Sequence, residues 1–242
     1  MTSKDKLEDP EAFDRRVAAL CDVYAMAPAF HAQGVHVVST DEKTGMQALE
    51  RKYPTKPTRP GLIERMEFEY IRHGTLCLTA NFEIATGSIL SPRIQETRTK
   101  GDFVDHISTT TSSDPAGRWI FVVDNLDTHK SEDLVRYVAA QIGDTSDLGV
   151  MFVSGVLRSR ASRTEYLERP EHRIRFVFTP RHCSWLNQIE LWFSMLARRF
   201  LRRASFTSKE DLKSRLLAFI AYFNAVLAKP YRWTYTGRLL AA

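Results

Sequence analysis

One short stretch constrains the fold of this chain more than any other, the uninterrupted apolar run Trp119-Ile-Phe-Val-Val123. A strand with one face in water alternates apolar and polar side chains, whereas an unbroken apolar run is typical of a strand buried on both faces. A sheet that holds such a strand must be covered by other elements. The run therefore predicts a buried central strand in a sheet covered by helices.

Strand and helix patterns alternate along the rest of the chain. Short runs rich in β-branched or other apolar residues predict strands at 35–40, 75–82, 84–90 and 174–178. Helices are expected at 11–29, 101–110, 131–141, 184–200 and from residue 207 onward. Residues 51–63, which include three prolines and a glycine, predict a loop. Together these elements predict an α/β fold with a mixed sheet flanked by helices.

Local signals refine some of these elements. The strands at 75–82 and 84–90 are expected to pair and to meet near residues 81–83. Ser184 is expected to cap the helix at 184–200, and Thr207-Ser-Lys-Glu210 has the form of a capping box for the last helix. Residues 148–156 are compatible with a further strand.

Positive charge is concentrated in the C-terminal part of the chain, whose formal net charge is +5 overall. Residues 1–155 hold 17 Lys or Arg and 23 Asp or Glu, a net charge of −6. Residues 156–242 hold 17 Lys or Arg and 6 Asp or Glu, a net charge of +11. This asymmetry indicates a polyanion partner such as nucleic acid, and the alternative is a solvated basic face without a partner.

Composition excludes several classes of protein. The three cysteines (Cys21, Cys77 and Cys183) form no C-x-x-C pair, which excludes a disulfide scaffold and any obvious zinc or redox motif. No apolar run approaches the roughly 20 residues that span a bilayer. The first ten residues are polar and acidic, unlike a signal peptide. We therefore expect a soluble, reduced, intracellular protein without a membrane partner.

Three acidic residues stand where the predicted fold would gather them. Asp41 follows the strand at 35–40, and Asp124 follows the central strand. Sites in α/β sheets collect at the carboxyl ends of strands, and parallel neighbours lie about 4.8 Å apart. Glu190 lies near the start of the helix at 184–200, beside its apolar stripe.

Three clustered carboxylates repel one another unless they bind a cation. Their hard oxygen ligands suit Mg²⁺ or Mn²⁺. Two such ions about 3.5–4 Å apart would activate a hydroxyl nucleophile and stabilise the leaving oxygen in a phosphodiester displacement. The alternative is that Asp41 and Asp124 only cap the following turns and that Glu190 is a surface residue.

These residues lie in motifs that resemble a known family. Asp41-Glu-Lys-Thr-Gly-Met-Gln47, Val122-Val-Asp-Asn-Leu-Asp-Thr-His-Lys130 and Phe178-Thr-Pro-Arg-His-Cys-Ser-Trp-Leu-Asn-Gln-Ile-Glu-Leu-Trp-Phe193 resemble the three acidic motifs of DDE-superfamily transposases. The resemblance is closest to the bacterial insertion-sequence branch related to mariner elements. Arg72-His-Gly-Thr75 and the tail at 229–237 are similar to the same group, so the resemblance runs from about Gln33 to Leu240.

The resemblance implies a transposase catalytic domain with an RNase H-like fold. Its catalytic and metal-binding triad would be Asp41, Asp124 and Glu190, and its cofactor two Mg²⁺ ions, with Mn²⁺ as a substitute. The implied reaction is cleavage of transposon ends followed by attack of a 3′-hydroxyl on target DNA, that is, recombination and integration of an insertion sequence. The implied partners are double-stranded DNA and a second copy of the chain in an active homodimer, and the implied location is the bacterial cytoplasm, at the nucleoid.

Two departures from the family pattern shape the expected domain organisation. Residues 1–32 are expected to be a helical lead-in and residues 33–240 the catalytic domain. Asp124 and Glu190 are separated by 65 residues, more than the family usually shows, which predicts an insertion at 142–172. Family members usually carry N-terminal helix-turn-helix modules, whereas only about 30 residues precede the first predicted strand, so we expect a catalytic domain, a fragment, or the product of a split or truncated gene.

Further polar residues near the motifs are candidates for DNA contacts. His129, five residues after Asp124, is placed to approach the scissile phosphate or a metal-bound water, and the alternative is a loop histidine with a structural partner. Asn187 is placed to orient Glu190 or to contact DNA, and helix capping is the alternative. Arginines after the Glu190 helix suit phosphate contacts, and a solvated helix end is their alternative. These arginines are Arg198, Arg199, Arg202 and Arg203.

Two other functions fit the same residues. A metal-dependent nuclease would use the acidic cluster to hydrolyse DNA without strand transfer. A decayed or co-opted DNA-binding protein would keep the basic charge without activity. The long motif at 178–193 favours a transposase over a nuclease without strand transfer. The intact Asp41, Asp124 and Glu190 argue against an inactive DNA-binding protein.

Overall fold

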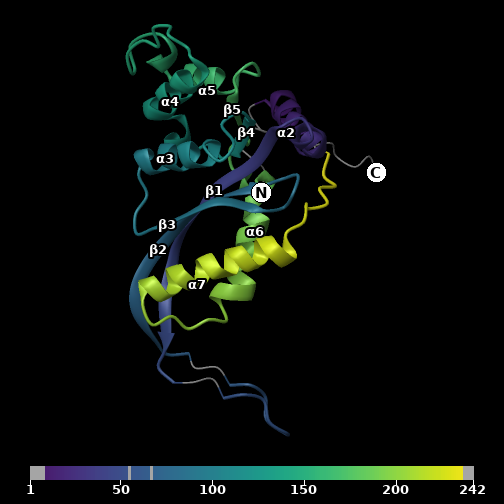
Figure 1. Cartoon of the computed structure of the whole chain (residues 1–242), viewed down its shortest axis with the longest axis vertical. Helices are drawn as coiled ribbons and strands as arrows, with labels where there is room; N and C mark the ends of the chain where they lie inside the picture. Colours follow the sequence, from purple (N-terminus) through teal and green to yellow (C-terminus); the bar gives the residue numbers. More distant parts are fainter. Residues whose placement is uncertain (1–8, 54–55, 66–67, 237–242) are drawn as a thin grey trace.

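A five-stranded mixed sheet forms the centre of the computed structural model, which describes residues 9–53, 56–65 and 68–236 (Figure 1). The strands lie in the order β3-β2-β1-β4-β5. β1 (Val35–Arg51) pairs antiparallel with β2 (Tyr70–Glu83), which pairs antiparallel with β3 (Ile89–Gln95). On its other edge β1 pairs parallel with β4 (Arg118–Val123), and β4 pairs parallel with β5 (Ile174–Phe178). The predicted mixed sheet is confirmed.

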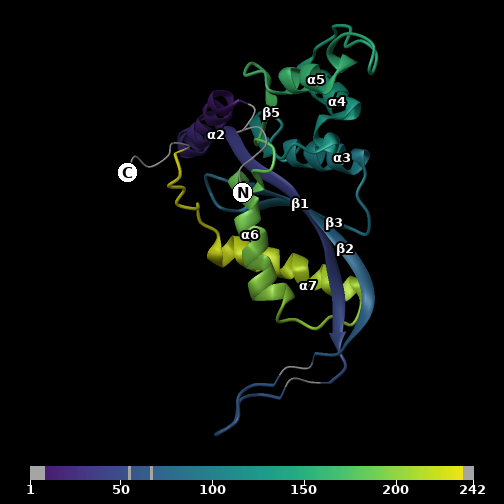
Figure 2. The same cartoon turned by 180° about the vertical axis from the view of Figure 1, so that it is seen from behind.

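β4 is buried on both faces, as its apolar run predicts. Trp119, Phe121 and Val123 pack into one core with three helices, α3 (Lys100–Thr111), α4 (Glu132–Ile142) and α5 (Arg160–Leu167). Ile120 and Val122 pack into a second core with helices on the opposite face, α2 (Pro10–His31), α6 (Ile189–Leu196) and α7 (Lys209–Tyr222). Figures 1 and 2 show the two groups of helices. The sheet therefore separates two apolar cores.

β1 is much longer than the predicted strand at 35–40. Its parallel pairing with β4 ends at Ser39, but its antiparallel pairing with β2 continues to Arg51. Pairing with β2 thus keeps the β1 backbone hydrogen-bonded beyond Ser39. This pairing is interrupted by a bulge near Gly45, whose φ of 64° suits glycine. Asp41 consequently lies within a strand, and the prediction that the strand ends there is wrong.

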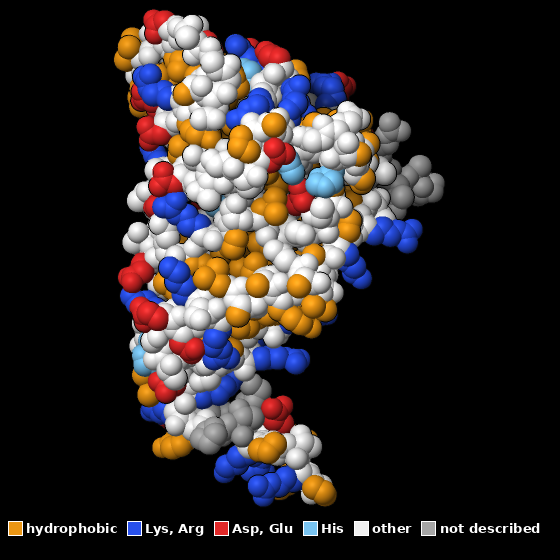
Figure 3. All heavy atoms as spheres, in the orientation of Figure 1, with side chains coloured by type: hydrophobic (Ala, Val, Ile, Leu, Met, Phe, Trp, Pro, Cys, Tyr) orange, Lys and Arg blue, Asp and Glu red, His pale blue; other side chains and the backbone are white. Residues whose placement is uncertain are grey.

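The paired ends of β1 and β2 protrude from the body of the protein (Figures 1 and 2). The described residues of the connection between β1 and β2 are irregular apart from two isolated bridges, Lys56–Arg65 and Arg59–Leu62. This agrees with the predicted loop at 51–63, of which residues 54–55 lie outside the described part. Exposed basic side chains gather at this end of the molecule (Figure 3), among them Lys56, Arg59 and Arg65.

The strand pair β2–β3 is confirmed, but its turn lies later than predicted. Phe82 and Glu83 remain paired with β1, so the chain does not turn at 81–83. The turn spans residues 84–88, where the Gly87 N–H donates to the Glu83 carbonyl at 2.8 Å. A φ of 75° at Gly87 fits the turn, because only glycine adopts it without strain.

The segment between α4 and β5 contains a loop and α5, and the possible strand at 148–156 is wrong. The Leu157 N–H donates to the Leu148 carbonyl at 3.0 Å, closing a compact loop. Gly149 and Gly155 approach each other's backbone too closely to allow a β-carbon. A short 3₁₀ turn, η2 (Val156–Arg158), leads from this loop into α5. The two glycines favour a turn over the extended pairing that a strand would need.

The predicted helix at 184–200 is broken into three parts: a 3₁₀ turn η3 (Ser184–Leu186), α6, and a π-helical turn η4 (Ala197–Leu201). Asn187 leaves the helical conformation, and α6 begins after Gln188 without a side-chain cap. Ser184 therefore does not cap α6.

α7 is confirmed, but its cap is shifted by one residue. The Ser208 hydroxyl accepts from the Asp211 N–H at 3.0 Å, so Ser208 and Asp211 replace the predicted pair Thr207 and Glu210. A π-helical turn η5 (Phe223–Leu227) follows α7. None of the described helices combines the length and the apolar character that crossing a membrane requires.

Candidate active site

Asp41 is a buried acid on β1, two residues beyond the last residue that pairs with β4. Only 7% of its surface is exposed. Its Oδ1 accepts from the Glu42 N–H at 2.7 Å, and its Oδ2 lies 3.4 Å from Asn187 Nδ2. Side chains alternate along a strand, and Asp41 therefore shares a face of β1 with Ser39, toward α6.

The charge of Asp41 is poorly compensated. Burial raises its pKa to about 7, and repulsion by Asp124 and Glu190 acts in the same direction. The Glu42 N–H and the positive charge of His129 oppose this rise without cancelling it. A buried carboxylate with such a pKa is neutral in mildly acidic solution and gains from a nearby cation when it ionises.

Asp124 follows β4 directly and keeps its charge because His129 lies beside it. Its Oδ1 accepts from the Leu126 N–H at 3.0 Å and lies 2.8 Å from His129 Nδ1. Burial acts to raise the pKa of Asp124, but the hydrogen bond and positive charge of His129 outweigh it, so the pKa is lowered. Burial likewise opposes protonation of His129, yet Asp124 and Glu42 raise its pKa to about 9. The pair is thus an imidazolium beside a carboxylate.

His129 is fully buried, with its ring 4.2 Å from that of Phe103. Its Nε2 lies 3.7 Å from Glu42 Oε1, on the face of the sheet opposite to Asp41. Its ring is enclosed by protein side chains in this structure, which is the arrangement of the predicted alternative, a loop histidine with a structural partner. His129 holds Asp124 in its ionised form.

Asn187 is also fully buried, and it fastens the start of α6 to β1. Its Oδ1 accepts from the Ser39 hydroxyl, and its Nδ2 donates to the Thr40 carbonyl at 3.1 Å. The same Ser39 hydroxyl accepts from the Ile189 N–H at 2.8 Å. Both polar atoms of the Asn187 side chain are thus engaged within the protein. Asn187 binds β1 beside Asp41, and it does so because it has left the helical conformation.

Glu190 lies in the first turn of α6 and is exposed. Its charge reaches Asp41, whose pKa it raises together with Asp124. Among residues 9–53, 56–65 and 68–236, three His, Cys, Asp or Glu ligand atoms come within 4.8 Å of one another only at His31, His36 and Glu83. The charges of Asp124 and Glu190 thus act on Asp41, but the three carboxylates are more widely spaced than the ligands of a single tightly bound ion.

Glu42 and Arg98 belong to the site but have no signal in the sequence. The Glu42 side chain is only 5% exposed, and Arg98 Nη1 donates to its Oε2 at 3.2 Å. Together with Asp124, Glu42 encloses the imidazole of His129. Because the predicted strand ends at residue 40, no sequence pattern places Glu42 on the face of β1 opposite to Asp41.

Basic side chains lie beyond the end of α6 and beside Asn125. The four arginines after α6 (Arg198, Arg199, Arg202 and Arg203) are exposed, and none of them forms an ion pair within the described part of the chain. A pocket of about 560 Å³ lies next to Asn125, the residue after Asp124. Its basic lining residues are Arg16, Lys130, Arg160 and Arg181. Burial lowers the pKa of Lys130 to about 8, and its ammonium donates to Asn125 Oδ1.

The raised pKa of Asp41 predicts how stability changes with pH. Because its pKa is near 7 when folded and 3.8 when exposed, the folded state holds an extra proton between these values, and stability falls as pH rises through them. In EDTA, Asp41→Asn should therefore gain stability over the parent by roughly 2–3 kcal/mol more at pH 8 than at pH 5. Urea unfolding measures this difference. The exposed Asp22→Asn is the control, and a pH-independent effect of Asp41→Asn would contradict the assignment.

Two solved structures of Mos1 mariner transposase are similar to this chain. The crystal structure of the Mos1 mariner paired end complex with Mn has a TM-score of 0.51 at 14% identity, covering 88% of this chain and 56% of that chain. The crystal structure of the catalytic domain of Mos1 mariner transposase has a TM-score of 0.47 at 11% identity, covering 87% of this chain and 82% of that one. This chain thus spans about half the length of the protein in the paired end complex. No curated protein matches the sequence.

The comparison with family models identifies the family of this chain. The family model described as DDE superfamily endonuclease matches residues 36–213, a region that contains Asp41, Asp124 and Glu190. The mixed sheet with helices on both faces is the RNase H-like fold, as predicted. Since the match covers most of the chain, this protein belongs to the DDE superfamily endonucleases, a family of nuclease and transposase enzymes.

Proposed function

We propose that this chain is the catalytic domain of a transposase that cleaves transposon ends and transfers the cut strand to target DNA, with Asp41, Asp124 and Glu190 as its catalytic, metal-binding residues. One observation carries the proposal: the buried carboxylate of Asp41 is repelled by two further carboxylates, Asp124 directly after β4 and Glu190 in the first turn of α6. This arrangement costs stability in the absence of a cation and supplies the oxygen ligands that divalent metals bind.

The three carboxylates fit Mg²⁺ or Mn²⁺ by their chemistry. Their oxygens are hard ligands, and the positive charge of His129 pairs directly with Asp124 and only partly offsets the charge of Asp41. Their wide spacing is better suited to two ions than to one. Bound divalent ions would activate the attacking hydroxyl and stabilise the leaving oxygen. The similar crystal structure of the Mos1 mariner paired end complex is a complex with Mn, and this supports the choice of metals.

The surrounding residues position the three carboxylates. His129 keeps Asp124 ionised, and Glu42 holds the far side of the imidazole. Ser39 and Asn187 bind the start of α6 to β1, which brings Glu190 toward Asp41. The three carboxylates thus come from different segments, and hydrogen bonds orient those of Asp41 and Asp124 before substrate binds.

Double-stranded DNA is the proposed substrate, because phosphates suit the basic surroundings of the site. Arg198, Arg199, Arg202 and Arg203 lie exposed beyond the end of α6, the helix that carries Glu190. The pocket beside Asn125 adds further basic groups. The similar Mos1 mariner structure is a paired end complex, which is consistent with this substrate.

The proposal extends to the organisation of the protein. Residues 33–240 would form the catalytic domain, residues 1–32 its helical lead-in, and residues 142–172 an insertion that contributes α5 to the pocket. The transposase would act as a homodimer on a bacterial insertion sequence, in the cytoplasm at the nucleoid. The motif at 178–193 and the similarity to the Mos1 mariner paired end complex support the transposase part of this assignment.

Asp124→Asn should abolish Mg²⁺-dependent cleavage of DNA, because a neutral amide neither offsets nor bridges metal charge. We expect nicking of a duplex substrate to fall roughly 100-fold or more, while a gel shift shows unchanged DNA binding. Asp127→Asn is the matched control, since Asp127 lies in the same loop but is exposed and paired with Arg160. Cleavage by Asp124→Asn near the parental rate would reject the site.

The products of Mg²⁺-dependent DNA cleavage distinguish a transposase from a nuclease without strand transfer. A transposase joins the cleaved 3′ end to a target duplex, whereas a nuclease without strand transfer only releases ends. Joined products that form with the parent and vanish with Asp124→Asn are the expected result. Cleavage without joining, on a substrate that carries the element's ends, would favour the nuclease.

Replacing the four arginines after α6 with alanine should weaken DNA binding about equally for all sequences. Each phosphate contact contributes about 0.9 to the slope of log K against log salt, so the slope should fall by up to about 3.6. Gel shifts with unrelated duplexes at several salt concentrations measure it. Arg136→Ala, on α4 across the sheet, is the control. Tight, salt-insensitive binding of the parent to one sequence would contradict this interface.

A further inference from the structure

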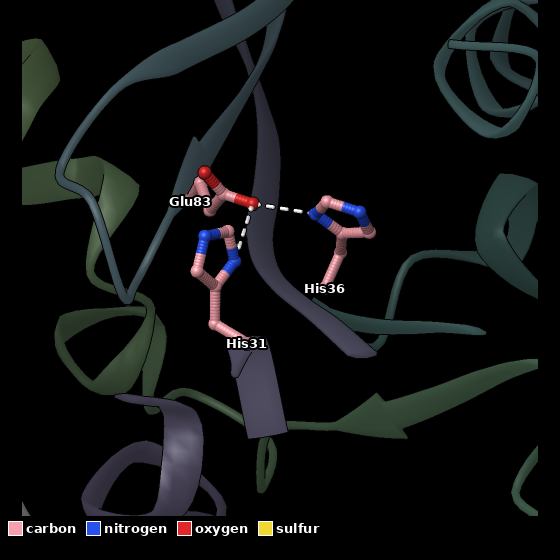
Figure 4. Close-up of side chains that lie close together, drawn as sticks. All are labelled: His31, His36 and Glu83. Carbon is pink, nitrogen blue, oxygen red and sulfur yellow. Dashed lines mark hydrogen bonds and ion pairs between the residues drawn. The ribbon is translucent and has the colours of Figure 1, made fainter. Parts of the chain in front are cut away.

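A second group of potential metal ligands lies where α2 joins the sheet, apart from the three acidic residues. His31 is the last residue of α2, His36 is the second residue of β1, and Glu83 is the last residue of β2. Figure 4 shows the three side chains turned toward one another. Among the described residues, they alone bring three ligand atoms within 4.8 Å of one another.

Both imidazoles direct the same nitrogen at one carboxylate oxygen. Glu83 Oε1 lies 2.6 Å from His36 Nδ1 and 3.5 Å from His31 Nδ1 (Figure 4). Ligand atoms around a tetrahedral zinc ion with bonds of about 2.0–2.1 Å lie about 3.3 Å apart. The two distances to Glu83 bracket this value, and all three ligand atoms lie within 4.8 Å of one another, so small side-chain shifts would bring them to coordination distance.

The other ring nitrogen of His36 has a carboxylate partner of its own. His36 Nε2 lies 3.2 Å from Asp114 Oδ2, and the His36 ring stacks on Trp119 with the ring centroids 4.2 Å apart. Metal-bound histidines characteristically donate their second N–H to such a carboxylate, which fixes the tautomer. When Nε2 donates to Asp114, a neutral His36 directs its Nδ1 lone pair at Glu83. Two electron-rich atoms at 2.6 Å need a proton or a metal ion between them.

Burial and access also suit a bound cation. The Glu83 side chain is only 6% exposed, and its Oε2 accepts from the Thr86 hydroxyl at 2.6 Å, which leaves Oε1 for the two histidines. The His31 side chain is 40% exposed, so the cluster opens to solvent on one side. A cation could enter by this side and complete its coordination there with water.

We propose that His31, His36 and Glu83 form a binding site for a divalent transition-metal ion, best matched by Zn²⁺, with Asp114 orienting His36. Imidazole nitrogens select Zn²⁺ over the Mg²⁺ that suits an all-carboxylate set. The ion joins the C-terminal end of α2 to β1 and β2. It therefore stabilises the docking of α2 on the sheet, independently of cleavage at the acidic site.

Zinc binding to the full chain, without a histidine tag, tests this assignment. Calorimetric titration with ZnCl₂ is performed in excess MgCl₂, so that hard-ligand sites are occupied. We expect one Zn²⁺ per chain and a rise in the melting temperature. His31→Gln should lose both effects and keep its circular dichroism spectrum, because its side chain is partly exposed. Asp114→Asn should bind zinc about 10- to 100-fold more weakly.

His73→Gln is the matched control, because His73 forms a single histidine–glutamate pair with Glu50 at 2.7 Å outside the cluster. It should bind Zn²⁺ as the parent does. The assignment is overturned if the folded parent binds no stoichiometric Zn²⁺, or if His31→Gln keeps the parental affinity. Equal losses in His31→Gln and His73→Gln would also overturn it. In each case the cluster would be a network of histidine–carboxylate pairs without a metal.

Discussion

The chemistry of the acidic site depends on the burial of the Asp41 carboxylate. Only 7% of this residue is exposed, and the charges of Asp124 and Glu190 add to the cost of ionising it. This cost arises in the middle of a long strand, where an apolar side chain would have no charge to bury. A buried, like-charged carboxylate of this kind is typical of functional sites, because stability alone does not favour it.

The contacts around Asp41 explain why α6 lies where it does. The Ser39 hydroxyl donates to Asn187 and accepts from the Ile189 N–H, so one side chain of β1 engages both sides of the break before α6. On the α2 side, the Tyr24 hydroxyl donates to the Leu186 carbonyl at 2.8 Å. The packing of α6 and the approach of Glu190 to Asp41 thus depend on the same few hydrogen bonds. On the opposite face, Glu42 and His129 support Asp124.

The parts of the fold that sequence patterns predict well are those decided by local periodicity. The apolar run at 119–123 predicts β4 and its burial, and the alternation of elements predicts the mixed sheet. The length of β1 is not predictable in this way, because pairing with β2 rather than its own composition extends it beyond residue 40. A continuous helix at 184–200 is the wrong prediction, because its apolar stripe does not reveal that Asn187 binds Ser39 across the core.

The position of Asp124 follows from sequence patterns, but the roles of its neighbours depend on tertiary packing. Asp124 follows from the rule that sites gather at the carboxyl ends of strands. The burial of His129 against Phe103, and its contact with Glu42, join segments far apart in the chain. No spacing in the sequence distinguishes such a histidine from one exposed to DNA. The cluster of His31, His36 and Glu83 is similar, since β2 brings Glu83 to the two histidines only once the sheet forms.

The central claim is that Asp41, Asp124 and Glu190 face one another in order to share divalent ions. An anomalous difference map from crystals of this chain soaked in MnCl₂ tests it directly. The account predicts manganese peaks in the region bounded by these three carboxylates, with Asp41 within coordinating distance of at least one ion. A map without a peak there, from crystals that bind manganese at other sites, would contradict it.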